Sequence, residues 1–135
     1  MKMNYEELKT ANATPAAASM VETFRAMGYS LETAMADILD NSISAGANNI
    51  WISRIWKGGQ SIITIKDDGI GITKEDQKYI WDRFFQTSDS RNKDKNKGSG
   101  LGLSMVNRIV QLHLATIDVE SEVGKGTCFI VKFPI

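Results

Sequence analysis

The chain has few of the residue types on which several kinds of chemistry depend. It contains one cysteine, Cys128, and one histidine, His113, in 135 residues. A single cysteine cannot form an internal disulfide, which fits a reducing compartment, and a single histidine rules out a metal site built from several histidines. Because Cys128 lies in an alternating apolar run, we interpret it as a core residue rather than a nucleophile.

Charge and hydrophobic length argue against two further classes of partner. Sixteen acidic and sixteen basic side chains cancel, so we expect no direct nucleic-acid partner. No apolar run approaches the roughly 20 residues that cross a bilayer, and the N-terminus has no signal-peptide pattern. We therefore expect a single cytoplasmic domain with a real hydrophobic core, either by itself or as the cytoplasmic part of a larger receptor.

The most informative segment is Leu31–Ala47, LETAMADILDNSISAGA. At about 100° per residue it predicts a helix that begins after Ser30 and ends near Gly46. Asp37 and Asn41 fall on one face of this helix, a single turn apart. An asparagine oxygen suits a hydrated divalent cation, and a carboxylate beside it can orient a water or a hydroxyl; a solvated polar face without lysine is the alternative. The apolar residues expected on the buried face are Leu31, Met35, Ile38, Leu39 and Ile43.

The other elements are short helices and two β-hairpins. Glycine turns between alternating apolar runs predict the hairpins, and Gly28 stops a helix that precedes Ser30. We divide the chain into a lead-in segment, residues 1–15, and one domain, residues 16–135. The predicted elements are a helix over Ala16–Met27, a hairpin of Ile50–Trp56 and Ser61–Lys66, a short helix from Thr73 to Tyr79, and a hairpin of Thr116–Glu120 and Thr127–Phe133.

The first hairpin runs directly into Asp67–Ile72, DDGIGI. Glycines at alternate positions, Gly69 and Gly71, let a backbone approach a ligand closely. Asp67 ends a strand, so its carboxylate is aimed at whatever lies beyond the sheet. This arrangement indicates a loop that contacts a ligand.

A charged loop and a glycine-rich turn follow. Residues 86–97, QTSDSRNKDKNK, contain no apolar side chain, so we interpret them as a mobile loop, with a plain solvated loop as the alternative. Gly98–Leu103, GSGLGL, then opens a helix, whose N-terminus presents unpaired N–H groups that suit phosphate oxygens. The spacing matches neither a Walker loop nor a dinucleotide fingerprint. The loop cations are Arg91, Lys93, Lys95 and Lys97.

The helix opened by this turn is amphipathic. We expect its polar residues Asn107, Arg108 and Gln111 to face away from the core. His113 lies at its end, where we interpret it as a packing or capping residue. The residues expected on its buried face are Leu103, Met105, Val106, Ile109, Val110 and Leu112.

Four features occur in one order: Asp37 with Asn41 on a helix, DDGIGI after a strand, a charged loop into GSGLGL, and Gly124–Thr127, GKGT, opening the last strand. Together they resemble the GHKL superfamily of ATP-binding domains, which includes DNA gyrase B, heat-shock chaperone ATPases, histidine kinases and MutL. The resemblance covers the chain from about Ser30 to its end. From WDRFF onward the sequence is most similar to the catalytic domain of sensor histidine kinases, whereas GYSLETAMADILDNSISAGANNIWI looks more like MutL and MORC proteins.

This resemblance implies an α/β (α+β) two-layer sandwich of the Bergerat type, with a mixed, mainly antiparallel sheet and helices on one face. ATP and Mg²⁺ are the implied ligands. Asn41 would ligate the metal, Asp67 would accept the exocyclic amine of adenine, and Thr127 would reach the adenine side. The loop 86–98 would form a lid whose cations stabilise the transferring phosphoryl group. The implied nucleotide-contacting residues are Asn41, Asp67, Gly69, Gly71, Ile72, Phe84, Lys97, Gly98, Ser99, Gly100, Leu101, Gly102, Leu103 and Thr127.

Two main functions are compatible with this resemblance. The first is transfer of the ATP γ-phosphate to a phosphoacceptor on a partner domain or protein, as in histidine kinases; Phe84 and Phe85 match the aromatic positions that flank the kinase lid. The second is an ATP-hydrolysing switch similar to MutL or the chaperones, in which Asp37 stands where hydrolysing members carry a glutamate as general base. Asp37 and Asn41 are the implied catalytic residues. A stand-alone serine kinase similar to anti-sigma factors and a nucleotide-binding module without turnover are further alternatives.

The sequence also departs from the kinase pattern. The usual histidine followed by two glycines is replaced by His113, Leu114 and Ala115, so this helix end lacks its glycine cap. The chain contains no phosphoacceptor-histidine helix, so the acceptor, or a switch partner, would lie on another domain or protein. The oligomeric state is left open.

Overall fold

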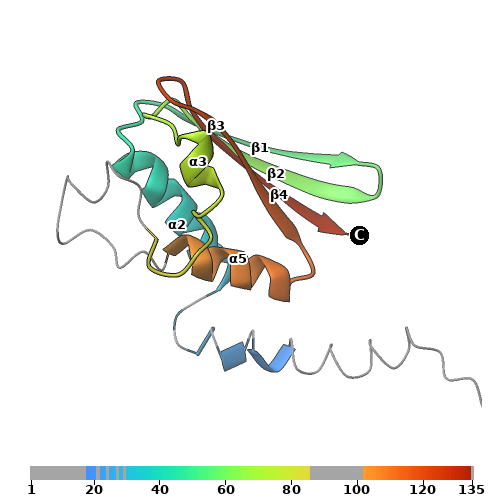
Figure 1. Cartoon of the computed structure of the whole chain (residues 1–135). Helices are drawn as coiled ribbons and strands as arrows, with labels where there is room; N and C mark the ends of the chain where they lie inside the picture. The colour runs from blue at the N-terminus through green and yellow to red at the C-terminus, as the bar shows by residue number, and fades with distance from the viewer. Residues whose placement is uncertain are drawn as a thin grey trace, which may run out of the picture.

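The computed structural model describes residues 18–20, 22–23, 25–26, 28, 30–85 and 102–134. In this part of the chain, helices α2 and α5 cover one face of a four-stranded sheet (Figure 1). Helical turns precede Gly28, which takes a φ of +82°. The elements are α2 (Leu31–Ser44), β1 (Ile50–Lys57), β2 (Gln60–Asp67), α3 (Lys74–Gln77), α5 (Gly102–Leu112), β3 (Thr116–Glu122) and β4 (Gly126–Pro134).

Helix α2 begins and ends as the sequence predicts. The hydroxyl of Ser30 accepts a hydrogen bond of 3.4 Å from the N–H of Thr33, which caps the first turn. At the other end Gly46 takes a φ of +76°, and the N–H of Ala47 donates to the carbonyl of Ser42. This is the Schellman arrangement, in which a glycine reverses the chain and supplies donors to the last turn.

For one residue of α2 the prediction of burial is wrong. Ile43 is 63% exposed, and the neighbouring Ser42 is 1% exposed in its place. The buried stripe consists of Ala34, Ile38 and Ser42, spaced four residues apart. Ser42 is tolerated inside because its hydroxyl finds a carboxylate partner at the end of β2.

The sheet is built from the two predicted hairpins. Its strand order is β1-β2-β4-β3, and the three strand pairs in the described residues are antiparallel. The β1–β2 turn consists of Gly58 and Gly59, both at positive φ, which a tight two-residue turn between twisted strands favours. The β1–β2 register runs without a bulge from the pair Ile50 and Asp67 to the pair Lys57 and Gln60.

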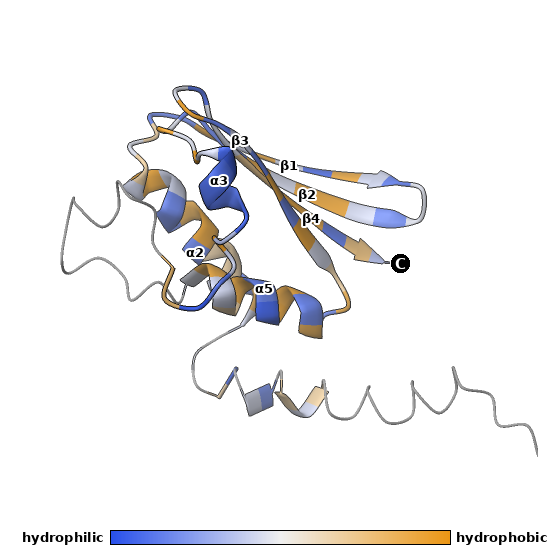
Figure 2. Cartoon of the chain, viewed as in Figure 1, coloured by the Kyte–Doolittle hydropathy of each residue, from blue (hydrophilic) through white to orange (hydrophobic). Residues whose placement is uncertain are grey.

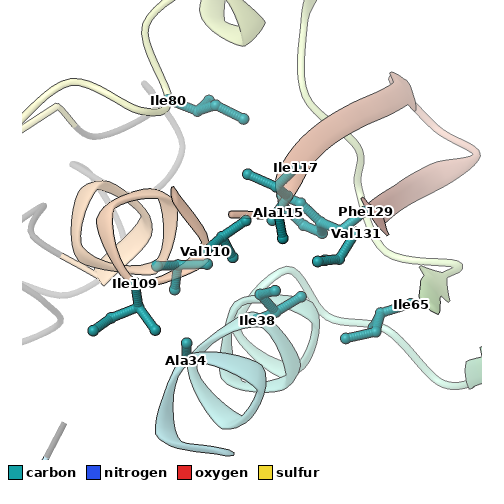
Figure 3. Close-up of a cluster of buried hydrophobic side chains, with 11 residues drawn as sticks. Ala34, Ile38, Ile65, Ile80, Ile109, Val110, Ala115, Ile117, Phe129 and Val131 are labelled. Atoms are coloured by element: carbon teal, nitrogen blue, oxygen red, sulfur yellow. The ribbon is translucent and has the colours of Figure 1, made fainter. Parts of the chain in front are cut away.

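The core lies between the two helices and one face of the sheet. Figure 3 shows Ala34 and Ile38 of α2 and Ile109 and Val110 of α5 directed into this space, opposite side chains of the sheet. In Figure 2, α3 is hydrophilic along its length, whereas α2 and α5 each carry both kinds of residue. The sheet residues of the core are Ile65, Ile117, Phe129 and Val131. Of the face predicted for α5, Val106, Ile109 and Val110 are buried, and Leu103, Met105 and Leu112 are half-buried.

Helix α5 ends in the same kind of cap as α2, with a leucine in the glycine position. The N–H groups of Leu114 and Ala115 donate to carbonyls of the last turn at 2.9 and 3.1 Å. Leu114 therefore adopts a left-handed φ of +59°, and its side chain is 76% exposed. Nδ1 of His113 lies 2.7 Å from the carbonyl oxygen of Ile109, which confirms a capping position for the histidine.

Strand β1 is more exposed than its apolar alternation suggests. It has a neighbour on one side only, and the helices pack on β2 and β3. A period of two residues identifies a strand, but it does not distinguish an edge strand from a central one. The exposed fractions of its large apolar side chains are 52% for Trp51, 62% for Ile52, 50% for Ile55 and 62% for Trp56.

Candidate functional site

Asp67 is the one charged side chain that is buried in the described part of the chain, with 2% of it exposed. It ends β2, and both of its oxygens accept hydrogen bonds. Oδ1 accepts from the N–H groups of Gly69 and Thr127 at 2.9 and 3.2 Å, and Oδ2 accepts from the hydroxyl of Ser42 at 2.6 Å. Helix α2 and strands β2 and β4 therefore meet at one carboxylate. The family resemblance implied that Asp67 and Thr127 both face the adenine side, whereas Ser42 was given no role.

The segment that follows Asp67 is fixed on two sides by main-chain hydrogen bonds. The N–H of Ile70 donates to the carbonyl of Ala45, at the end of α2, at 3.0 Å. The carbonyl of Ile70 accepts from the N–H of Gly124, in the β3–β4 turn, at 2.8 Å. The predicted ligand loop is thus a bridge between α2 and the second hairpin.

Two glycines of this region have no room for a side chain. A Cβ on Gly71 would lie 2.2 Å from the carbonyl oxygen of Glu122, and one on Gly126 would lie 2.0 Å from the carbonyl oxygen of Asp67. Both residues also take a positive φ, of +81° and +122°. Sequence reasoning took Gly71 as room for a ligand, and the structure adds that it makes room for the β3–β4 hairpin. It missed Gly126, for which the GKGT motif was the available signal.

Ser121 joins this loop to β4. Its hydroxyl accepts a hydrogen bond of 2.7 Å from the N–H of Ile72 and lies 2.7 Å from the hydroxyl of Thr127. The side-chain amide of Gln77 donates to the carbonyls of both Ile72 and Ser121, at 2.8 and 3.0 Å. Ile72 and Thr127, both predicted site residues, are thereby held beside each other.

Asp68 fixes the connection between α2 and β1. Its Oδ1 accepts hydrogen bonds from the N–H groups of Asn48 and Asn49 at 2.8 and 2.9 Å, and its Oδ2 accepts from the Asn49 side chain at 3.0 Å. These donors, the Asn49 side chain first, lower the pKa of the Asp68 carboxyl below its usual value. The two adjacent aspartates therefore have different roles, since Asp67 faces the core and Asp68 secures a loop.

Asp37 and Asn41 lie one turn apart on α2, as predicted. The Nδ2 of Asn41 donates to the main-chain carbonyl of Asp37 at 3.0 Å, which leaves Oδ1 as the side-chain atom that a cation would meet. One such oxygen fits Mg²⁺, because this ion keeps several waters and shares phosphate oxygens rather than needing a protein cage. Within the described ranges, no group of three or more histidine, cysteine, aspartate and glutamate side chains is placed to hold a metal ion by itself.

The remaining predicted site residues lie close to the ends of the residue ranges that the structure describes, or outside these ranges. Phe84 is 67% exposed at a φ of +66°, whereas the ring of Phe85 lies 5.8 Å from that of Tyr79 and packs against the core. Gly102 begins α5 and is exposed, and Leu103 packs at the margin of the core. The lead-in 1–15, the loop 86–98, and Lys97, Gly98, Ser99, Gly100 and Leu101 lie outside the described residues.

Comparison with known proteins identifies relatives of this chain. Residues 28–135 match the family model described as histidine kinase-, DNA gyrase B-, and HSP90-like ATPase. The sensor histidine kinase YclK of Bacillus subtilis is 41% identical over 102 residues, which are 75% of this chain and 22% of that protein. The histidine-protein kinase ArlS of Staphylococcus aureus is 42% identical over 97 residues, 70% of this chain and 21% of that protein. The chain thus spans about a fifth of the length of these relatives.

Solved structures agree on the fold. Full-length ShkA in complex with AMPPNP superposes with a TM-score of 0.63 at 21% identity, over 75% of this chain and 20% of that one. The mycobacterial sensor histidine kinase MprB gives 0.60 at 24% identity, over 75% of this chain and 67% of that one. No helix within the described ranges combines the length and the apolar character needed to cross a membrane. By sequence and by fold, the chain belongs to the histidine kinase-, DNA gyrase B- and HSP90-like ATPase family and is an ATP-binding domain of that family.

Proposed function

We propose that this domain binds ATP with Mg²⁺ between α2, the Asp67–Ile72 segment and the start of α5, and that it passes the γ-phosphate to a histidine on a partner domain or protein. The observation that carries the proposal is the buried carboxylate of Asp67 with its three donors. The 41% and 42% identity to sensor histidine kinases supports phosphotransfer as the reaction.

Asp67 suits recognition of an adenine ring. A carboxylate has about four positions at which it accepts hydrogen bonds, and three of them are taken by Ser42, Gly69 and Thr127. We propose that the exocyclic amine of adenine donates to the remaining position. Guanine carries a carbonyl at the corresponding place, and two acceptors facing each other in a buried site are unfavourable. The site therefore discriminates ATP from GTP.

Asn41 suits the phosphate end of the same nucleotide. Its side-chain amide is anchored to the carbonyl of Asp37, so its oxygen is presented in a fixed direction. Magnesium bound there would bridge phosphate oxygens and offset their negative charge. Helix α5 begins at Gly102 and Leu103. The N-terminal end of a helix favours anions through its unpaired N–H groups.

The direct test is transfer of label from γ-labelled ATP to a histidine-containing dimerisation domain from a two-component kinase, with the full chain supplied in trans. Acid-labile, alkali-stable label on that domain is expected, because phosphohistidine has this stability. Asn41→Ala serves as the matched inactive variant. The kinase proposal fails if no acceptor is labelled while titration shows that Mg·ATP is bound.

Hydrolysis of ATP is the second candidate, and the position of Asp37 favours it. The carboxylate lies on α2 one turn before Asn41, where a general base for an attacking water would stand. Steady-state phosphate release should then fall in Asp37→Asn and stay unchanged in Asp40→Asn, an exposed aspartate of the same helix. Equal rates in the parent and in both variants would exclude Asp37 as a base.

A further inference from the structure

The free edge of strand β1 is a surface that the ATP-binding site does not use. In Figure 1, β1 is the outermost strand on one side of the sheet, and the far end of the β1–β2 hairpin projects beyond the helices. The described part of the N-terminal segment lies beside α5 instead, where Met20 Sδ accepts a contact of 3.6 Å from Arg108. Nothing in the described residues therefore covers this edge.

The hydrogen-bonding pattern shows which groups are open. In a two-residue hairpin turn, the residues that close the turn exchange both main-chain bonds, and every second pair does the same. The closing pair is Lys57 and Gln60, so Trp51, Ser53 and Ile55 use their main-chain groups toward β2. The bond from the N–H of Asp68 to the carbonyl of Asn49 follows the same alternation. The main-chain groups that point to the free edge belong to Ile50, Ile52, Arg54 and Trp56.

This edge also lacks two of the devices that usually prevent strand pairing. Proline, a bulge or an exposed charge blunts an edge strand. Strand β1 has no proline and no bulge, and its exposed side chains are the large apolar ones of Trp51, Ile52, Ile55 and Trp56 together with Ser53, Arg54 and Lys57. Its central cation, Arg54, is held within the domain, 4.9 Å from the centre of the Trp56 ring and 3.2 Å from the hydroxyl of Ser61.

The other edge of the sheet is protected. Strand β3 carries three exposed acidic residues, and Gln77 occupies the main-chain carbonyl of Ser121 on its outer side. A chain of domains linked from β1 to β3 is therefore disfavoured, even though their charges are opposite. The acidic residues of β3 are Asp118, Glu120 and Glu122.

We propose that β1 pairs antiparallel with β1 of a second copy of this chain, with Ser53 on the two-fold axis. In this register Arg54 faces Ile52 of the second copy, and all the open main-chain groups from Ile50 to Trp56 find partners. Trp51 lies opposite Ile55 of the second copy, an aromatic and aliphatic pair of the kind that stabilises sheets. A register centred on Arg54 would place two like charges opposite each other, which is unfavourable.

The rest of the fold is compatible with this arrangement. Even-numbered residues of β1 face the helix side in both copies, so the pairing gives one continuous eight-stranded sheet with all helices on one face. Because α2 packs on β2 and α5 on β3, the two paired β1 strands separate the helical layers of the two copies. An isologous contact of this kind closes at the dimer.

The oligomeric state of the full chain tests the proposal. Sedimentation velocity from low to several hundred micromolar should show a monomer–dimer equilibrium. Ile52→Lys, which opposes a second cation to Arg54, should raise the dimer dissociation constant by about tenfold or more. Leu114→Lys introduces the same charge at an exposed leucine far from β1 and should leave the constant unchanged. A parent chain that stays monomeric throughout overturns the proposal.

Disulfide trapping tests the register. In a Cys128→Ser background, Ser53→Cys places two thiols directly opposite each other, where Cβ atoms are about 5 Å apart, and should oxidise to a covalent dimer. Ile55→Cys places its two thiols about 13 Å apart and should not. Equal cross-linking of the two variants overturns this register. Strong hydrogen-exchange protection of the outward-facing N–H groups of Ile52 and Arg54 at concentrations where the chain is monomeric would instead show that another segment covers the edge, which also overturns the proposal.

Discussion

The hydroxyl of Ser42 on α2 donates a hydrogen bond of 2.6 Å to the Asp67 carboxylate at the end of β2. These residues are 1% and 2% exposed, so water has little access to either. The bond fixes the direction of the carboxylate that we propose reads the adenine ring. It also connects the helical layer to the sheet at the centre of the site.

Replacing Ser42 by alanine should therefore be costly. The substitution removes a donor to a buried charged acceptor, and we expect a loss of about 1–3 kcal/mol in the free energy of unfolding. Urea denaturation at neutral pH measures this loss. Ser44→Ala changes an exposed serine of the same helix and should alter stability by less than about 0.5 kcal/mol. A Ser42→Ala variant as stable as the parent would show that the hydrogen bond contributes nothing net.

Asp67→Asn should reduce ATP affinity and the preference for ATP over GTP together. A hydrogen bond to a charged group contributes about 1.5–3 kcal/mol. Calorimetric titration should therefore show a dissociation constant for Mg·ATP that is roughly 10- to 100-fold larger. Circular dichroism should first confirm that the variant is folded, because Asp67 also binds two main-chain N–H groups. Unchanged affinity in a folded variant would contradict the assignment of Asp67 to the base.

Asn41→Ala should weaken nucleotide binding only when magnesium is present. Loss of one oxygen ligand is expected to cost about 1.4 kcal/mol or more, a tenfold weaker dissociation constant for Mg·ATP. Titration with ATP in excess chelator is the matched control, and there the parent and the variant should bind equally. A loss of the same size in both conditions would place Asn41 on the nucleotide itself and not on the metal.

Leu114→Gly should stabilise the domain. Leu114 takes a φ of +59° that costs an L-residue about 1–2 kcal/mol and costs glycine almost nothing, and its exposed side chain contributes little packing. We expect a gain of about 1 kcal/mol in the free energy of unfolding by urea denaturation. Leu114→Ala keeps the Cβ and should give no comparable gain. A destabilised glycine variant would show that the leucine side chain is needed at the helix end.

Asp68→Asn should reveal a pH-dependent contribution to stability. The donors around Asp68 lower its pKa in the folded state, so the unfolded chain takes up this proton at a higher pH than the folded chain does. The contribution is complete above the unfolded-state pKa and disappears as pH falls through the folded-state pKa. Urea midpoints should therefore differ between parent and variant at pH 7 and converge below about pH 4. Asp118→Asn removes the same charge from the exposed surface of β3 and is the matched control.

Much of the fold is accessible from local patterns in the sequence. Ser30 and Thr73 cap their helices, Gly46 ends α2, and the paired glycines close the first hairpin. Each of these features depends on a few neighbouring residues, which is why composition and spacing predict them. The proximity of Asp67 and Thr127 was implied by family resemblance, and the structure places them in contact.

What the sequence could not predict depends on partners distant in the chain. At about 100° per residue Ser42 falls within the apolar arc of α2 and Ile43 at its edge. Choosing core residues by polarity leaves the serine out, because the carboxylate that accepts its hydrogen bond lies 25 residues later in the chain. The exposure of β1 and the role of Gly126 also depend on residues that are distant in the chain. The first is decided by the strand order, and the second by the close approach of β2 to β4.

The two main-chain hydrogen bonds of Ile70 have a consequence for the substitutions that this segment accepts. Ile70 is hydrogen-bonded to Ala45 on one side and to Gly124 on the other, through main-chain groups alone. Hydrogen bonds of this kind place no demand on the side chain of Ile70, whereas its neighbours Gly69 and Gly71 have no room for a Cβ beside Ala45 and Glu122. We therefore expect substitutions of Ile70 to leave this junction intact and side chains at Gly69 or Gly71 to disrupt it.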